Sequence, residues 1–425
     1  MDATKSTSAS KMTSNQTLRA LDYLSFFIGD VMGGIGPYLA IYLRSFRHWE
    51  QGSIGVILSA MGMTTIVVQI PAGALMDSCK KKRALFCFST VLMGLGAFAI
   101  TIFPQFSAVL AAQIVYGVAA AFAGPCIVAI SLGVVGSRLF AARVARNEAF
   151  NHLGNVMAAI FAGAAGYALS QNWIFYMIAF FAVCSTCATF FIKREDIDDD
   201  VACGADESIN TDALNDYRVI ETKAVRSDFR SLFADKHLVA FAIAVTLFHM
   251  ANAAMLPLAG QYLAERDVRW APIWISACII TAQVVMVPAS ILAGHFAETW
   301  GRKPVFLLAM MVLPLRGFLY TLSNSPYLVV PVQLLDGIGA GIFGVLVSVI
   351  VADLTAGTGR YNSARGVVMT AQGIGAALSN LTAGAIVQAA GYRAGFLSLT
   401  LVALIGLVIC YVWLPETHKR FNSTT

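Results

Sequence analysis

Twelve apolar stretches follow one another along this chain, and each is long enough to cross a lipid bilayer as a helix. The hydrocarbon core of a bilayer is about 30 Å thick, so a crossing helix needs about 20 mostly apolar residues. The expected spans are 20–43, 51–76, 84–103, 106–136, 147–168, 172–192, 237–263, 271–297, 304–322, 327–352, 365–389 and 393–414. The pattern predicts an all-α integral membrane protein with the lipid bilayer as its solvent.

The composition supports this interpretation. Hydrophobic residues make up 58% of the chain and charged residues only 12%, whereas a soluble domain carries about 25% charged residues. The mean hydropathy is +0.71. A soluble protein of several domains would scatter its apolar residues, and here they are grouped. The net charge of +5 does not indicate a nucleic-acid partner, because the cations lie in short connectors between apolar stretches.

A polar segment divides the spans into two sets of six. Residues 193–236 hold twelve of the 24 acidic residues and few large apolar ones, which indicates a solvated linker. The expected organisation is a tail at 1–19, a six-helix bundle at 20–192, the acidic linker at 193–236, a second six-helix bundle at 237–414 and a tail at 415–425.

The positions of the cations predict the orientation. With the N-terminus in the cytoplasm, the cytoplasmic tails and connectors contain 23 of the 29 Lys and Arg residues, and the opposite connectors contain five. Because cytoplasmic connectors of membrane proteins are enriched in Lys and Arg, both termini are expected in the cytoplasm. The expected location is a cell membrane, plasma or inner.

The two sets of spans repeat each other. The segment QIVYGVAAAFAG at 113–124 lies 220 residues before QLLDGIGAGIFG at 333–344, and PYLAIYL at 37–43 lies 220 residues before PLAGQYL at 257–263. Similarity at one offset predicts two pseudo-symmetric bundles. Internal repeats of this kind are typical of secondary transporters, whose solute site lies between the repeats near the middle of the membrane.

Two charged connectors carry a recognisable pattern. Between spans 2 and 3, the chain places Gly73, Leu75, Asp77, Lys81 and Lys82 at the positions of a loop signature of approximate form G-x-L-x-D-R-x-G-R-[KR]. A weaker copy between spans 8 and 9 consists of Gly294, Glu298, Gly301, Arg302 and Lys303. With its twelve spans and acidic central segment, the chain resembles the major facilitator superfamily over essentially its full length.

The resemblance implies a role for both connectors. In this family the acid and the cations form a charge network on the cytoplasmic face that holds the halves together when the cavity faces outward. The expected gating residues are Gly73, Asp77, Lys81, Lys82, Arg83, Gly294, Glu298, Gly301, Arg302 and Lys303. The alternative interpretation is that these cations only specify topology.

Three charged residues are expected at membrane depth, where ionisable groups are costly and are functional candidates. At 1.5 Å per helical residue, Asp30 lies about 14 Å into span 1, Arg316 about 18 Å into span 9 and Asp336 about 14 Å into span 10. Because the last two lie at nearly the same depth on consecutive helices, we expect an ion pair between Arg316 and Asp336. Either a structural or a transport role is open for this pair.

Asp30 and His249 are the candidates for proton coupling. No span of the first half carries a cation, so Asp30 has no fixed counter-charge there, and low dielectric favours its protonated form. The resemblance also places Asp30 on span 1, one of the four helices (1, 4, 7 and 10) that line the cavity in the family. His249 lies at similar depth on span 7, and imidazole ordinarily titrates near neutral pH. Packing within the bundle is the alternative for both.

Further polar and aromatic residues are expected to line the solute cavity, although packing is the alternative for each. They are Gln113, Asn252, Gln261, Gln333, Phe26, Tyr38, Phe122, Phe248 and Phe343. The chain has no phosphate-binding G-x-x-x-x-G-K-[ST] motif, zinc-ligand spacing or catalytic triad pattern, so we expect no cofactor, metal or enzymatic activity.

These observations predict a secondary transporter, working as a monomer, that moves a small organic or amphipathic solute by alternating access. Proton-coupled export is favoured, and proton-coupled uptake of a metabolite or metal chelate is the alternative. A transporter-like receptor is a third, more remote hypothesis.

Overall fold

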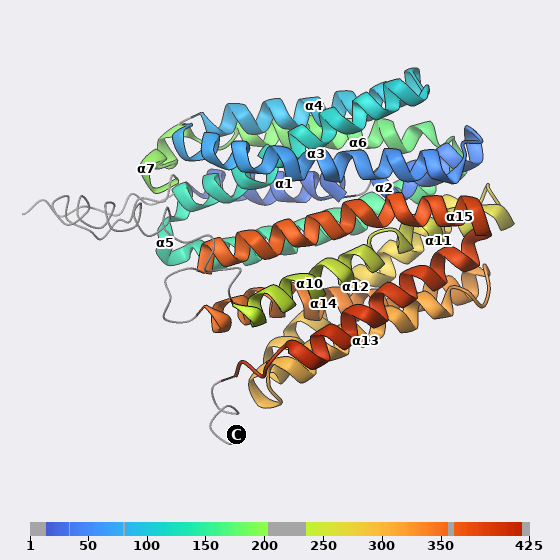
Figure 1. Cartoon of the computed structure of the whole chain (residues 1–425). Helices are drawn as coiled ribbons and strands as arrows, with labels where there is room; N and C mark the ends of the chain where they lie inside the picture. Colours follow the sequence, from blue (N-terminus) through green and yellow to red (C-terminus); the bar gives the residue numbers. More distant parts are fainter. Residues whose placement is uncertain (1–13, 34, 80, 203–234, 356–360, 419–425) are drawn as a thin grey trace, which may run out of the picture.

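The computed structural model describes residues 14–33, 35–79, 81–202, 235–355 and 361–418 (Figure 1). Most of the predicted acidic linker and the outer parts of both tails lie outside these ranges. For Asp30, Gly73 and Asp77 the structure describes the backbone alone.

Each regular element in the described ranges is a helix. The first half contains α1 (Asn15–Gly33), α2 (Ile35–Ile41), a π-helix η1 (Tyr42–Phe46), α3 (Gln51–Ser78), α4 (Lys82–Ile102), α5 (Phe106–Ala168), α6 (Asn172–Phe190), a 3-10 turn η2 (Arg194–Asp196) and α7 (Asp199–Ala202). The second half contains α10 (Lys236–Asn252), α11 (Met255–Arg266), α12 (Ala271–Thr299), α13 (Arg302–Leu319), α14 (Pro326–Leu354) and α15 (Tyr361–Trp413).

These helices correspond to the twelve predicted spans. The α5 helix contains spans 4 and 5, which are separated where Gly136 adopts a φ of 70°, and α15 contains spans 11 and 12, separated at Gly391 with a φ of 81°. Positive φ values favour glycine, which has no Cβ. Span 1 is divided among α1, α2 and η1, and span 7 is divided between α10 and α11.

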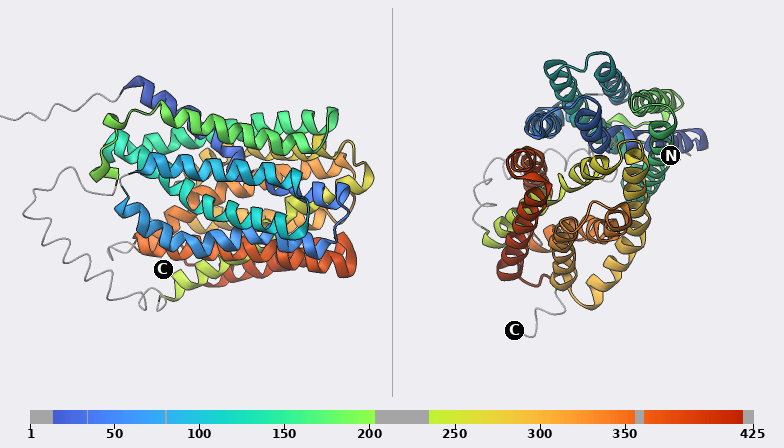
Figure 2. Two further views of the ribbon diagram at one scale, coloured as in Figure 1. Left: turned by 90° about the horizontal axis from the view of Figure 1, so that it is seen from above. Right: turned by 90° about the vertical axis from the view of Figure 1, so that its right-hand side faces the viewer.

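The helices form two bundles, one from each half of the chain. Figure 2 shows the first half, in blue to green, and the second half, in yellow to red, as two neighbouring groups of roughly parallel helices. The predicted all-α fold with two pseudo-symmetric six-helix bundles is therefore confirmed. The beginning of the predicted linker packs on the first bundle, because the Asp198 N–H donates to the Gly133 carbonyl at 2.9 Å.

Equivalent glycines hold the central helices of each bundle in close contact. A Cβ on Gly154 of α5 would lie 1.9 Å from the Phe26 carbonyl oxygen of α1, and a Cβ on Gly375 of α15 would lie 2.1 Å from the Thr246 carbonyl oxygen of α10. These glycines are 221 residues apart, close to the repeat offset found in the sequence. Small residues allow helix backbones to approach closely inside a membrane.

The bundles are joined from one end to beyond mid-length. At this joined end the Gly52 N–H of α3 donates to Gln388 Oε1 of α15 at 2.7 Å, and further along the same helix pair Ile66 packs against Gly373. Beyond this point a cavity of about 600 Å³ lies between α3, α10 and α15, lined partly by Gln69, Thr246 and Thr370. The boundary between the halves is therefore hollowed on this side of the Ile66–Gly373 contact.

Gly154→Ala is expected to lower the thermal stability of the detergent-purified protein by about 1–3 kcal/mol, because the added methyl group must displace the α1 backbone. Gly344→Ala is the matched control, since a Cβ at Gly344 meets nothing within 4 Å. Thermal unfolding should show a clear loss for the first variant and little change for the second. An equal change in thermal stability in the two variants would contradict the close crossing of α1 and α5.

Candidate functional site

Arg316 connects three helices of the second bundle. Its side chain is 2% exposed, and its Nη1 forms an ion pair with Asp336 Oδ1 of α14. Its Nη2 donates to Asn252 Oδ1 of α10 at 2.8 Å, and its Nε lies 3.3 Å from Met255 Sδ. Arg316 and Asp336, which the sequence places at nearly the same depth, are thus in contact. The Asp336 side chain, at 19% exposed, is the more accessible member of the pair.

Such an arrangement compensates a charge that is expensive to bury. A guanidinium in low dielectric needs both a counter-charge and hydrogen-bond acceptors for its remaining N–H groups. Asp336 supplies the charge, and Asn252 supplies a neutral acceptor from another helix. Any movement of α10 relative to α13 must break or exchange the Asn252 bond. The cluster therefore links the position of α10 to the ion pair between α13 and α14.

His249 lies beside an aromatic pair. Phe248 and Phe343 stack with ring centroids 4.5 Å apart, and the His249 ring centroid is 4.7 Å from that of Phe343. The carbonyl of Val245 lies 3.3 Å from His249 Nδ1 and accepts a hydrogen bond from it. His249 is therefore packed against α14 one turn from the Asn252 side chain, and it has no carboxylate partner among the described residues.

The three expected cavity glutamines are buried within the protein. Gln113, Gln261 and Gln333 are 2%, 1% and 0% exposed. Gln333 Nε2 donates to the Tyr320 hydroxyl at 2.6 Å. In this conformation these side chains do not line an open cavity.

Of the remaining aromatics proposed from the sequence, Tyr38 joins the two bundles. Its hydroxyl lies 2.7 Å from Ser276 Oγ of α12, and the ring is 1% exposed. Phe26 and Phe122 are partly buried in the first bundle. The backbone of Asp30 continues α1 four residues beyond Phe26.

The polar contacts that close the joined end were not predicted from the sequence. Gln51 Nε2 donates to the Tyr392 hydroxyl, and Gln388 Nε2 donates to Glu50 Oε2 at 2.9 Å. These residues lie at helix ends, where polar side chains are ordinary in a membrane protein, so their pattern carried no specific signal. The repeat does not indicate them either, because they join one half to the other.

His152 also makes a contact that was not predicted from the sequence. Its Nδ1 lies 2.8 Å from Gln283 Oε1 and joins α5 to α12 across the boundary between the bundles. Gln283 is one of several glutamines within the predicted spans, and nothing in the spacing connects it with His152. This contact lies deeper along the helix pair than the Tyr38–Ser276 contact.

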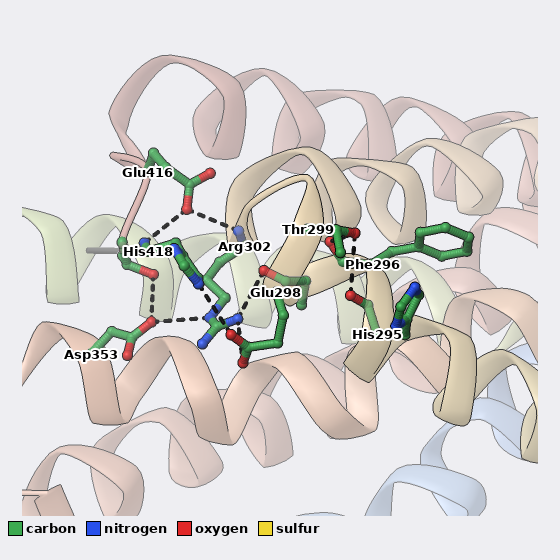
Figure 3. Close-up of polar contacts among 10 residues, drawn as sticks. His295, Phe296, Glu298, Thr299, Arg302, Asp353, Glu416 and His418 are labelled. Atoms are coloured by element: carbon green, nitrogen blue, oxygen red, sulfur yellow. Dashed lines mark hydrogen bonds and ion pairs between the residues drawn. The ribbon is translucent and has the colours of Figure 1, made fainter. Parts of the chain in front are cut away.

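The connector between α12 and α13 is the centre of a polar network (Figure 3). The Arg302 guanidinium pairs with Glu298 Oε1 at 2.9 Å and with Asp353 Oδ2, at the end of α14, at 3.3 Å. His418 Nε2 lies 3.1 Å from Glu298 Oε2, and the Thr417 hydroxyl donates to Asp353 Oδ2 at 2.9 Å. The C-terminal segment thus belongs to this network, which ties together elements of the second bundle alone.

Glu416 caps α13. Gly301, with a φ of 100°, is the N-cap residue and has no side chain to offer. The Glu416 carboxylate takes that role, accepting the N–H groups of Arg302 at 2.8 Å and Lys303 at 3.1 Å. A carboxylate at a helix N-terminus satisfies free N–H groups and interacts favourably with the helix dipole. Lys303 Nζ lies 5.5 Å from the Tyr411 ring centroid, away from the network, and Gly294 has open space around it.

The mirrored connector before α4 has different contacts. Lys82 Nζ donates to the Cys79 carbonyl at 3.0 Å, and Arg83 Nη2 donates to the carbonyls of Thr189 and Phe190 at the end of α6. Lys81 is exposed. The proposed partner acid Asp77 has only its backbone described, as does Gly73.

A buried charge cluster in the first bundle was not predicted. Asp22 pairs with Arg143 at 2.6 Å and with Arg146 at 2.7 Å, and the Asp22 and Arg143 side chains are 6% and 4% exposed. Asn147 Oδ1 accepts from Arg143 Nε at 2.7 Å. The available signal was the Arg143-x-x-Arg146 spacing, which places both cations on one helix face, together with an acid near the start of span 1.

Comparisons with known proteins agree with the fold. A family model described as Major Facilitator Superfamily matches residues 21–289 and 241–425. A protein of Mycobacterium tuberculosis (strain CDC 1551 / Oshkosh) described as the uncharacterized MFS-type transporter MT2531 is 46% identical over 399 residues, which cover 94% of this chain and 93% of the relative. The crystal structure of a mutant of nucleoside transporter NupG aligns with a TM-score of 0.78 at 17% identity, covering 94% of this chain and 100% of that one.

Removal of one member of the Arg316–Asp336 pair is expected to cost more than removal of both. Arg316→Leu or Asp336→Leu leaves a charge without its partner, which costs about 3–5 kcal/mol in a buried pair. The double variant should recover a large part of that loss in thermal unfolding of the purified protein. Strict additivity of the two single losses would contradict the coupling.

Glu416→Ala is expected to lower thermal stability by about 1 kcal/mol, because α13 loses its N-cap acceptor. Glu148→Gln, which changes an exposed carboxylate on α5, is the control. Hydrogen exchange should show faster amide exchange at Arg302 and Lys303 in the Glu416 variant only. Unchanged exchange there would contradict the capping role.

Proposed function

Because the chain belongs to the Major Facilitator Superfamily, we propose that it is a secondary active transporter of a small organic or amphipathic solute and that it works by alternating access. The observation that carries this proposal is the asymmetry of the boundary between the bundles. Contacts such as Gly52–Gln388 and Tyr38–Ser276 join them toward one end, and a cavity separates α3 from α10 and α15 toward the other. A boundary joined at one end and hollowed at the other is what alternating access requires of a state that is closed on one side of the membrane.

The contacts at the joined end are of a kind that can open. Tyr38–Ser276, Gly52–Gln388 and Gln388–Glu50 are hydrogen bonds near helix ends. A hydrogen bond of this type contributes about 1 kcal/mol net, since water can replace the partner. Rocking of one bundle against the other can exchange them for contacts at the opposite end.

Proton coupling is proposed for Asp30, with His249 as the rival residue. Asp30 lies on α1, and the close crossing of Gly154 and Phe26 fixes the helix that carries it. In the clusters of Asp22 and Asp336 an arginine compensates the carboxylate charge. Asp22, the other acid of α1, thus has fixed counter-charges, which leaves Asp30 as the stronger candidate in the first half.

Export is the favoured direction, and proton-coupled uptake of a metabolite or metal chelate is the alternative. The two differ only in the direction of solute flux relative to the proton. Uptake into proteoliposomes with an imposed pH gradient of either sign, using a panel of small solutes that includes nucleosides, distinguishes them. Accumulation with the interior acidic supports export by exchange, and accumulation with the exterior acidic supports uptake. No gradient-dependent flux of any solute would favour the receptor hypothesis.

Asp30→Asn is expected to uncouple transport from the proton gradient. The amide resembles a permanently protonated acid, so the variant should bind solute and exchange it at equal concentrations on both sides. It should not accumulate solute, and its exchange rate should not vary with pH. Counterflow and gradient-driven uptake in proteoliposomes measure the two activities separately.

His249→Gln is the matched comparison. If Asp30 carries the proton, the His249 variant keeps gradient-driven accumulation and a pH-dependent rate. Loss of pH dependence in the His249 variant, with a normal profile in Asp30→Asn, would transfer the coupling role to His249.

A further inference from the structure

A cationic pocket lies where α4 begins and α6 ends. It has a volume of about 420 Å³ and is lined by Lys81, Lys82, Arg83, Ala84, Cys87, Thr189, Phe190, Arg194, Ile197 and Asp199. Four of these residues are cations and only Asp199 is an acid. The positive-inside rule assigns this surface to the cytoplasmic side, at the level where α4 enters the membrane.

The polar groups at this pocket are suited to an anion. Arg83 Nε is buried and has no hydrogen-bond partner among the described residues, although Nη2 of the same guanidinium donates to the Thr189 and Phe190 carbonyls. Those carbonyl contacts fix the orientation of the guanidinium. In addition, the N-cap residue Lys81 makes no side-chain cap to α4, so the first N–H groups of this helix also favour an anion.

The apolar part of the pocket distinguishes between anions. Ala84 and Cys87 continue down α4, and Phe190, which is 69% exposed, lies opposite on α6. Cys87 is five residues below Lys82, about 7 Å further into the membrane. A small inorganic ion would use only the cations, whereas a phospholipid would place its phosphate at the cations and its glycerol and first acyl carbons along this wall.

We propose that this pocket is a binding site for an anionic phospholipid of the adjacent leaflet, with Lys81, Arg83 and Arg194 contacting its phosphate. Each basic residue near an anionic membrane surface strengthens such binding by about fivefold. The proposal is independent of the solute and of the direction of transport. It requires only that α4 and α6 cross the membrane beside this pocket.

Native mass spectrometry of the detergent-purified full chain, titrated with dioleoyl-phosphatidylglycerol or dioleoyl-phosphatidylcholine, tests the site. Wild-type protein should retain phosphatidylglycerol preferentially. Arg194→Gln should weaken that binding about fivefold without changing phosphatidylcholine binding. Arg83→Gln should also weaken it, and thermal unfolding without added lipid shows whether the lost carbonyl contacts alone explain the change. Arg365→Gln removes an exposed cation from the start of α15, outside the pocket, and should bind as wild type does.

Equal retention of both lipids by the wild type would overturn the proposal, as would phosphatidylglycerol binding by Arg194→Gln and Arg365→Gln at the same affinity. Competition by glycerol 3-phosphate tests whether a soluble anion can occupy the pocket. Weak competition supports a lipid site, because the apolar wall adds affinity for the lipid alone. Complete displacement of phosphatidylglycerol at equal concentration would show a small-anion site instead.

Discussion

A chain in hydrocarbon must satisfy its own backbone hydrogen bonds, and the rest of this structure depends on that constraint. It makes each crossing a helix, and helices in lipid then associate by close packing more than by a hydrophobic force. The contacts of Gly154 with Phe26 and of Gly375 with Thr246 are the result. They hold α1 and α10 at equivalent places in the two bundles.

The ion pairs among the described residues lie within one bundle or the other, and the polar contacts between bundles are hydrogen bonds. Asp22 with Arg143 stiffens the first bundle, and Arg316 with Asp336 stiffens the second. Breaking a buried pair costs several kcal/mol, whereas a hydrogen bond that water can replace costs about 1 kcal/mol. Motion is therefore expected at the Tyr38–Ser276 boundary, with each bundle moving as a unit.

Sequence periodicity was sufficient to predict the spans, the two bundles and the proximity of Arg316 and Asp336, because rise per residue converts position directly into depth. It did not reveal Asn252 as the second partner of Arg316, since rotation of α10 about its axis is set by packing. Asp22 with Arg143 was missed because a charge near a span end is ordinary at a membrane surface. His152 with Gln283 was missed because it joins separate bundles, and no internal repeat encodes that contact.

The mirrored connectors differ in the partners of their cations. Arg302 finds an acid at Asp353, and the residue 220 positions earlier is Gly133, whose carbonyl instead accepts the Asp198 N–H of the linker. The first bundle therefore lacks an acid at this mirrored position. The cations of its connector, Lys81, Lys82 and Arg83, line a pocket beside α4 together with Arg194. The second connector stabilises its own bundle through Glu416 and Asp353, while the first places Lys81, Arg83 and Arg194 around a pocket beside α4, so the two connectors differ in the partners of their cations.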